Sequence, residues 1–142
     1  MKYHFKVHGN EKDGFWAECL ELPGCQSQGD SKAELIENLH EALDLFLSEP
    51  EDSKFVFEEP QRRLGGRNII EITVSPSVAI ANKMRSIRLL RKLTQREMCE
   101  VLGIAHLSAY QRLEDPRRAN PEMKTLAKIK SVFPELKLDE VI

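Results

Sequence analysis

The sequence predicts an α+β protein in which a small antiparallel sheet with one helix precedes an all-helical region. Near the N-terminus, over residues 3–7, apolar and polar residues alternate as in a half-buried strand. Residues 68–74 are rich in β-branched residues, which are also typical of strands. From Ser77 onward apolar residues recur every three or four positions, as in helices. The charge also changes sign along the chain, because the first half is acidic and the second basic. We therefore expect two domains, residues 1–75 and 76–142.

The contrast in charge between the two halves is large. Residues 1–66 hold seven Lys and Arg against fourteen Asp and Glu, whereas residues 67–142 hold fourteen against nine. Such an asymmetry suggests two modules with different partners. An acidic surface suits a basic protein, and a basic surface attracts nucleic acid.

Composition and cysteine content favour a globular protein of the cytoplasm. Of the 142 residues 41% are hydrophobic and 31% charged, a balance typical of folded domains. The apolar runs are too short for a membrane-spanning helix, and the N-terminus lacks the apolar segment of a signal peptide. Three cysteines, Cys19, Cys25 and Cys99, are an odd number and predict reduced thiols rather than a disulfide framework.

The first domain is expected to begin with a meander of three antiparallel strands. Alternation over residues 3–7 predicts the first strand, and the turn cluster at 10–14 leads back into a second strand at 15–19. The break at Pro23-Gly24 leaves residues 25–28 as a short third strand.

One helix follows this meander. Ser31 and Glu34 have the spacing of a capping box, in which both side chains satisfy free amides at a helix start. Apolar residues then recur at helical steps as far as Phe46. The helix is expected to end near Ser48, because Pro50 disfavours helical backbone before it.

An irregular segment and a final strand complete the first domain. Residues 49–67 contain two prolines and a pair of glycines, and within them residues 55–57 are expected to pack on the sheet or add a short strand. Residues 68–74 predict the last strand. Because so small a domain is marginally stable and leaves strand edges unpaired, we expect a homodimer or higher homo-oligomer.

The second domain is expected to be helical throughout. Four helices are predicted, over about residues 77–93, 94–102, 106–114 and 120–132, and the tail after Pro134 is ambiguous. Thr94 and Glu97 form a second capping-box pattern. Gly103 is expected in the left-handed conformation that ends a helix.

The two short middle helices have the spacing of a DNA-reading helix-turn-helix. Gln95 is at the start of the first helix, where it can reach a phosphate. Cys99 lies where the two helices cross, a position that requires a small side chain for close packing. Gly103 forms the turn between them. In the second helix the expected inward-facing residues are Leu107, Tyr110 and Leu113. Those turned outward or to the edge are then His106, Ser108, Gln111 and Arg112.

The charge around this helix pair is strongly positive. Residues 82–130 contain twelve Lys and Arg against five Asp and Glu, which suits contacts with backbone phosphates. The DNA-binding residues predicted on these grounds are Gln95, Arg96, His106, Ser108, Gln111, Arg112, Arg117 and Arg118.

At residues 82–138 the sequence resembles a known family of DNA-binding domains. The pattern Arg88-x-x-Arg91-Lys92-x-Thr94-Gln95-x-x-Met98-x-x-x-Leu102-Gly103-Ile104, then Leu113-Glu114 and Asn120-Pro121, resembles the Cro/phage-repressor (Xre-type) helix-turn-helix family. Cys99 stands where that family usually has Ala, and one extra residue separates Gly103 from Glu114, which affects the register of the recognition helix. The resemblance implies a dimer with half-sites about 34 Å apart on DNA.

A second resemblance covers about residues 1–48. Glu21-Leu22-Pro23-Gly24-Cys25 followed by Ser27-Gln28-Gly29-Asp30 is similar to a string in the HicB antitoxin family. The resemblance implies a degenerate ribonuclease-H-like β-β-β-α-β fold completed by residues 68–74. It also implies a HicA-type partner, a small basic toxin that cleaves mRNA, and repression of the chain's own operon. The candidate toxin-facing residues are Trp16, Glu18, Glu21, Leu22 and Asp30, of which Trp16 and Leu22 also fit the core.

Other functions remain as alternatives. A solitary transcriptional regulator would use its acidic half to dimerise or to sense a ligand. A Mg²⁺-dependent nuclease would need converging carboxylates, but residues 3–7 offer none, which leaves Glu18, Glu21 and Asp30. Cys19 and Cys25 lack the close paired spacing of a zinc site, so neither a metal nor a cofactor is expected.

Overall fold

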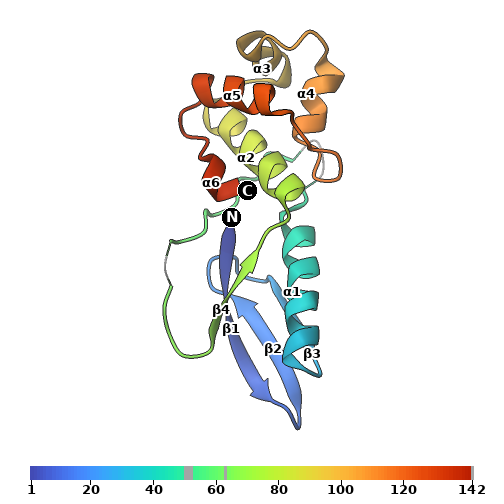
Figure 1. The fold of residues 1–142 in the computed structure, drawn as a ribbon, viewed down its shortest axis with the longest axis vertical. Helices are drawn as coiled ribbons and strands as arrows, with labels where there is room; N and C mark the ends of the chain where they lie inside the picture. Colours follow the sequence, from blue (N-terminus) through green and yellow to red (C-terminus); the bar gives the residue numbers. More distant parts are fainter. Residues whose placement is uncertain (50–52, 63, 142) are drawn as a thin grey trace. The chain divides into compact units, whose positions relative to one another are not determined.

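The computed structural model describes residues 1–49, 53–62 and 64–141. In this part the chain is a mixed α+β protein with a four-stranded antiparallel sheet and six helices (Figure 1). It divides into two compact units, which we call the sheet unit, residues 1–47 with 57–75, and the helical unit, residues 48–56 with 76–142. This division differs from the predicted domains in one segment, because residues 48–56 group with the helices.

The sheet unit is built on the predicted meander. Strands β1 (Lys2–Asn10), β2 (Gly14–Cys19), β3 (Gln26–Gly29) and β4 (Ile69–Thr73) lie in the order β3-β2-β1-β4, with every neighbouring pair antiparallel. The turn between β1 and β2 is fixed by Asn10, whose side-chain oxygen accepts hydrogen bonds from the backbone amides of Lys12 and Asp13.

The last strand runs antiparallel to β1, with Tyr3 opposite Ile72. A strand that follows a helix directly in one sheet usually returns parallel to the strand before that helix. Here β4 is antiparallel to β1, and the β3-β2-β1-β4 pairings make it antiparallel to β3 as well. The long connection between Leu47 and Ile69 permits this direction, because it lets the chain re-enter the sheet from the other end. β4 and β3 are the two edges of the sheet.

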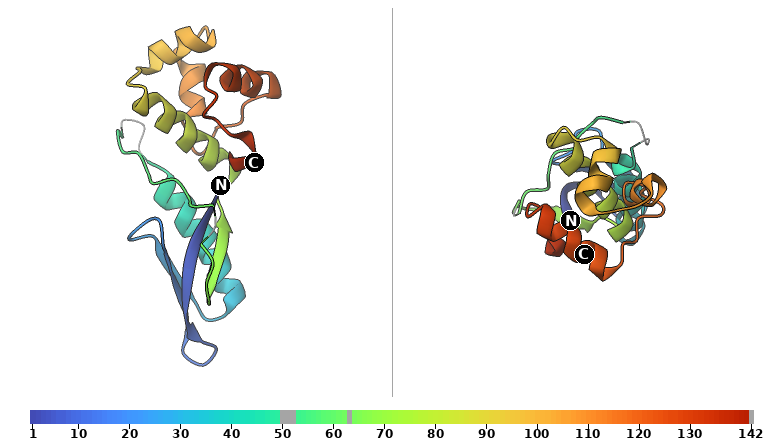
Figure 2. Two further views of the ribbon diagram at one scale, coloured as in Figure 1. Left: turned by 90° about the vertical axis from the view of Figure 1, so that its left-hand side faces the viewer. Right: turned by 90° about the horizontal axis from the view of Figure 1, so that it is seen from above.

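Helix α1 (Lys32–Leu47) lies along one face of the sheet (Figures 1 and 2). The predicted cap is present in a modified form: the Glu34 amide donates to Ser31 Oγ at 3.1 Å, and the Glu34 carboxylate accepts from the Asp30 amide at 3.0 Å. The residues that face the sheet are Leu35, Leu39, Leu43 and Leu47, all buried. Pro50, the expected reason for the helix end, lies outside the described residues.

Between α1 and β4 the described residues form neither helix nor strand. Phe57 is buried, and its ring lies 5.7 Å from that of Phe46 on α1, whereas Phe55 is exposed. Residues 55–57 were expected to pack on the sheet or add a short strand; they form no strand, and the ring contact of Phe57 is with α1. The Tyr3 hydroxyl adds a hydrogen bond to the Glu58 carbonyl, which fastens this segment to β1.

The helical unit consists of α2 (Pro76–Leu90), α3 (Gln95–Leu102), α4 (Leu107–Leu113), α5 (Met123–Val132) and α6 (Leu138–Val141). The capping box of Thr94 and Glu97 is confirmed, and so is the left-handed Gly103, with φ of 68°. α5 begins at Met123, three residues later than the predicted start at Asn120, and the ambiguous tail forms α6. The largest fully buried side chains of the unit are Met84, Met98, Tyr110, Ile129 and Phe133.

A buried ion pair joins α2 to the residue after α4. Arg88 Nε donates to Glu114 Oε2 at 2.7 Å, and Arg88 Nη2 donates to Glu114 Oε1 at 2.9 Å. Arg88 Nη1 also donates to the Leu93 carbonyl at 3.3 Å. Hydrogen bonding to Glu114 raises the pKa of the Arg88 guanidinium above its ordinary value. Both side chains are buried, and two parallel hydrogen bonds hold them in one geometry.

The three cysteines are free thiols. Cys19, the last residue of β2, and Cys25, just before β3, are both buried, and the Cys19 amide donates to the Cys25 carbonyl at 2.8 Å. Burial raises the pKa of Cys19 to about 11 and that of Cys25 to about 12. Neither thiol is therefore ionised near neutral pH. No helix in the described part of the chain has both the length and the apolar character needed to cross a membrane.

Candidate nucleic-acid interface

The predicted DNA contacts lie on and around α3 and α4, two short helices joined by the turn at Gly103 (Figure 1). Tyr110 and Leu113 of α4 are buried as predicted, whereas Leu107 is only half-buried. This orientation leaves Ser108 and Arg112 exposed on the outer side of α4. These two side chains are therefore free to approach a partner.

A hydrogen bond joins the start of α3 to the middle of α4. Gln111 Nε2 donates to Gln95 Oε1 at 3.2 Å. Because the bond uses the Gln95 oxygen, the Gln95 amide hydrogens remain available to a phosphate. Gln111 keeps its oxygen and its second N–H, which together match an adenine edge. Its half-buried position brings it to the boundary between the two helices rather than to the outer face.

The two arginines after α4 differ in what surrounds them. Arg118 Nε donates to Asp115 Oδ2 at 2.7 Å, and hydrogen bonding to Arg118 lowers the pKa of the Asp115 carboxyl. Arg117 donates only its backbone amide to Asp115, and its side chain is exposed. His106 is also exposed, at the N-cap of α4, with no capping bond from its side chain. Of this group Arg118 is partly neutralised, and Arg117 is the stronger candidate for a phosphate contact.

A concave surface, which encloses a volume of about 530 Å³, lies beside the starts of α3 and α4. The residues that line it are Ser53, Lys54, Arg88, Leu89, Leu93, Thr94, Gln95, Arg96 and Leu107. Gln95 and Arg96 were predicted as DNA contacts, but Ser53 and Lys54 were not. Sequence reasoning missed them because they belong to the irregular segment that it counted with the first domain. The only signal for Lys54 was its charge.

In the sheet unit, Trp16 and Glu18 stand on the outer face of the strand pair β1–β2. Trp16 is 43% exposed, and its ring stacks on His8 with centroids 4.2 Å apart. His8 Nε2 and Glu18 Oε1 are 3.2 Å apart. Asp30, just after β3, is also exposed. These three predicted toxin-facing residues are accessible.

The other two predicted toxin-facing residues are not accessible. Glu21 is 7% exposed, and its carboxylate accepts from the His4 amide at 2.9 Å and from the Gln61 amide at 3.2 Å, while His4 Nδ1 lies 2.9 Å away. Leu22 is 3% exposed. The Cys25 amide donates to the Leu22 carbonyl at 3.1 Å and closes the turn after β2. Both side chains therefore belong to the core, which corrects their assignment to the surface.

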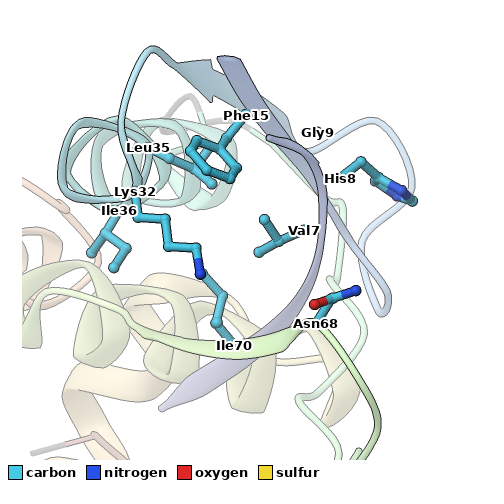
Figure 3. Close-up of a pocket in the computed structure, with 9 residues that line it drawn as sticks. All are labelled: Val7, His8, Gly9, Phe15, Lys32, Leu35, Ile36, Asn68 and Ile70. Carbon is cyan, nitrogen blue, oxygen red and sulfur yellow. The ribbon is translucent and has the colours of Figure 1, made fainter. Parts of the chain in front are cut away.

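A second hollow, of about 410 Å³, lies between α1 and the sheet (Figure 3). Its walls include Val7, Phe15 and Ile70, and the Lys32 ammonium group points into it, 5.9 Å from the centre of the Phe15 ring. His8 also borders the hollow, but its ring points away (Figure 3). None of the predicted toxin-facing residues lines this hollow.

The nuclease alternative was based on Glu18, Glu21 and Asp30. Among the residues that the structure describes, no three or more His, Cys, Asp or Glu side chains are grouped in a way that could hold a metal ion. Glu18 lies beside His8, and Glu21 is bonded to His4 and Gln61.

No protein-family model matches the chain, and no curated protein matches it either. The case for a function therefore rests on the residues themselves.

Proposed function

We propose that the chain is an antitoxin of the HicB kind. Its helical unit binds operator DNA as a homodimer through a helix-turn-helix formed by α3 and α4, and its sheet unit binds a HicA-type toxin, a small basic ribonuclease. Binding DNA upstream of its own reading frame represses the operon that encodes both proteins. The observation that carries the proposal is the exposed polar and basic side chains on and around the α3–α4 pair.

The local geometry supports a DNA-reading role for these helices. α3 begins at a complete capping box and ends at the left-handed Gly103, so its length and the turn to α4 are fixed. Tyr110 and Leu113 anchor α4 in the core, which presents Ser108 and Arg112 outward. Short rigid helices that expose such side chains suit insertion into the major groove.

The distribution of charge supports the same role. Several basic residues of the helical unit are compensated internally: Arg88 by Glu114, Arg91 by Glu135 and Arg118 by Asp115. Among the described residues, the exposed arginines with no ion pair include Arg96, Arg112 and Arg117. The uncompensated arginines thus lie at the start of α3, on α4 and just after α4, where a phosphate backbone would pass.

Replacing Arg112 by alanine is expected to weaken binding to the DNA upstream of the chain's own reading frame about 10- to 100-fold. The reason is that one arginine reading a guanine edge contributes about 1–3 kcal/mol of discrimination. Fluorescence anisotropy with that DNA and with a random-sequence duplex measures the effect. Arg67→Ala is the matched control, because it removes an exposed arginine from the sheet unit. Equal affinities for Arg112→Ala and the unmodified chain would remove α4 as the recognition helix.

The sheet unit supports a protein partner of opposite charge. The sheet unit, residues 1–47 with 57–75, holds seven Lys and Arg against twelve Asp and Glu, a net charge of −5. The stacked pair of Trp16 and His8 with Glu18 beside it combines an exposed aromatic ring with a carboxylate. Buried aromatic anchors surrounded by polar groups dominate the energy of protein interfaces, and charge complementarity speeds association.

Replacing Trp16 by alanine is expected to weaken binding of the toxin at least 30-fold, because a central aromatic anchor contributes about 2 kcal/mol or more. The partner to test is the small basic protein encoded by the neighbouring reading frame, by co-expression, rescue of growth and calorimetry. Leu45→Ala is the matched control, since Leu45 is an exposed apolar residue on α1. A Trp16→Ala chain that still rescues growth and binds at full affinity would show that the toxin uses another surface.

A second candidate, a solitary regulator that senses a ligand, is favoured by one observation. The hollow beside Lys32 has a volume suited to a small molecule and combines apolar walls with one ammonium group. The two functions are separated by the same co-expression experiment. If no neighbouring reading frame is toxic and nothing co-purifies, the chain acts alone and the hollow becomes its sensing site.

A further inference from the structure

The concave surface beside α3 brings together residues that are far apart in the sequence. Ser53 and Lys54 come from the segment before β4, whereas Gln95 and Arg96 open α3. All four line the same surface of the helical unit, since residues 48–56 pack as part of that unit. No Asp or Glu is among the described residues that line it. Its three cations can only donate hydrogen bonds, whereas Ser53, Thr94 and Gln95 can both donate and accept.

Two of the three cations on this surface are open to a partner. Of its three cations, Arg88 is compensated by two hydrogen bonds to Glu114. Lys54 and Arg96 are exposed, and neither makes an ion pair within the described part of the chain. Two uncompensated cations that face one hollow favour an anion there.

Two neutral side chains of the surface, Ser53 and Gln95, also have hydrogen-bond donors available to a ligand. The Phe55 amide donates to Ser53 Oγ at 3.2 Å, which fixes the hydroxyl oxygen and leaves its hydrogen for another acceptor. Gln95 Oε1 is occupied by Gln111, which leaves the Gln95 amide hydrogens. An ammonium, a guanidinium, a hydroxyl and an amide thus border one hollow, and the described residues that line it include no carboxylate.

We propose that Ser53 and Lys54 bind a backbone phosphate of operator DNA, beside the phosphate contacted by Gln95 and Arg96. The inference rests on the proposed DNA-binding function and extends its interface to a segment outside the four helices predicted from the sequence. Because phosphates carry no sequence information, this contact adds affinity and sets position, but it does not select bases.

Lys54→Ala is the test, in the full chain, with the duplex from upstream of its reading frame and a random-sequence duplex. The substitution is expected to lower the slope of log affinity against log salt by about 0.9, since one phosphate contact is lost. The same slope implies binding about eightfold weaker at 0.1 M salt, equally for both duplexes. Lys12→Ala, which removes an exposed lysine from the turn between β1 and β2, is the matched control and should leave the slope unchanged.

Each outcome decides the proposal. A reduced slope for Lys54→Ala, with an unchanged slope for Lys12→Ala, supports it. An unchanged slope, while Arg96→Ala still lowers it, overturns the role of Lys54 and leaves the proposed DNA binding intact. Tighter binding by Lys54→Ala also overturns it, because the segment would then obstruct the interface. If the unmodified chain binds neither duplex, the proposed function and this inference both fall.

Discussion

Replacing Glu114 by alanine is expected to destabilise the helical unit by about 3–5 kcal/mol, because it leaves the Arg88 guanidinium buried without its partner. Arg88 and Glu114 are only 9% and 8% exposed, and two hydrogen bonds of 2.7 and 2.9 Å join them. A loss of this size is a large part of the stability of a small domain. Urea unfolding followed by circular dichroism measures it, and DNA binding should fail at temperatures where the unit has unfolded.

The matched control is Glu135→Ala in the same helical unit. Glu135 also makes two hydrogen bonds to an arginine, Arg91, at 2.7 and 3.0 Å, but both partners are more than 40% exposed. An exposed pair contributes at most about 1 kcal/mol, so this variant should unfold almost as the unmodified chain does. Equal losses for the two variants would contradict the assignment of the Arg88–Glu114 pair as the buried support of α2 and α4.

Replacing Gly29 by alanine is expected to destabilise the sheet unit by about 3 kcal/mol, because no space exists for a β-carbon there. A Cβ on Gly29 would lie 2.5 Å from the Leu35 amide nitrogen and 2.9 Å from Leu35 Cα. These are backbone atoms in the first turn of α1, so relief requires moving the helix away from β3. The midpoint of thermal unfolding of the full chain measures the loss.

Gly65→Ala serves as the control for this substitution. A Cβ on Gly65 would meet nothing within 4 Å, and the backbone there does not need positive φ. Loss of backbone freedom in the unfolded chain should make this variant neutral or up to about 1 kcal/mol more stable. If Gly29→Ala were as stable as Gly65→Ala, the first turn of α1 would not pack against Gly29 as tightly as these distances indicate.

The parts of the fold that sequence reasoning predicted correctly depend on neighbours along the chain. The capping box of Thr94 and Glu97 joins residues three apart, and Gly103 acts through its own backbone. Alternation and helical periodicity likewise place β1, β2 and α1 to within a few residues. Such local signals need no knowledge of what packs against them.

The parts that it missed depend on contacts between distant residues. Glu21 looked like a surface carboxylate, but it is buried by partners 17 and 40 residues away, His4 and Gln61. The direction of β4 depends on the long connection before it rather than on its own β-branched residues. Lys54 likewise reaches the surface beside α3 only because its segment joins the helical unit. None of these has a signature in a window of ten or fifteen residues.

The discontinuity of the helical unit has a consequence for how such proteins can be recombined. The chain passes between the two units three times, after residues 47, 56 and 75. A gene fusion that joined a new N-terminal half at Pro76 would carry α2 to α6 but leave residues 48–56 behind. Residues 76–142 alone are therefore not the complete helical unit. A fusion to a new N-terminal half would preserve the unit only if it also carried residues 48–56.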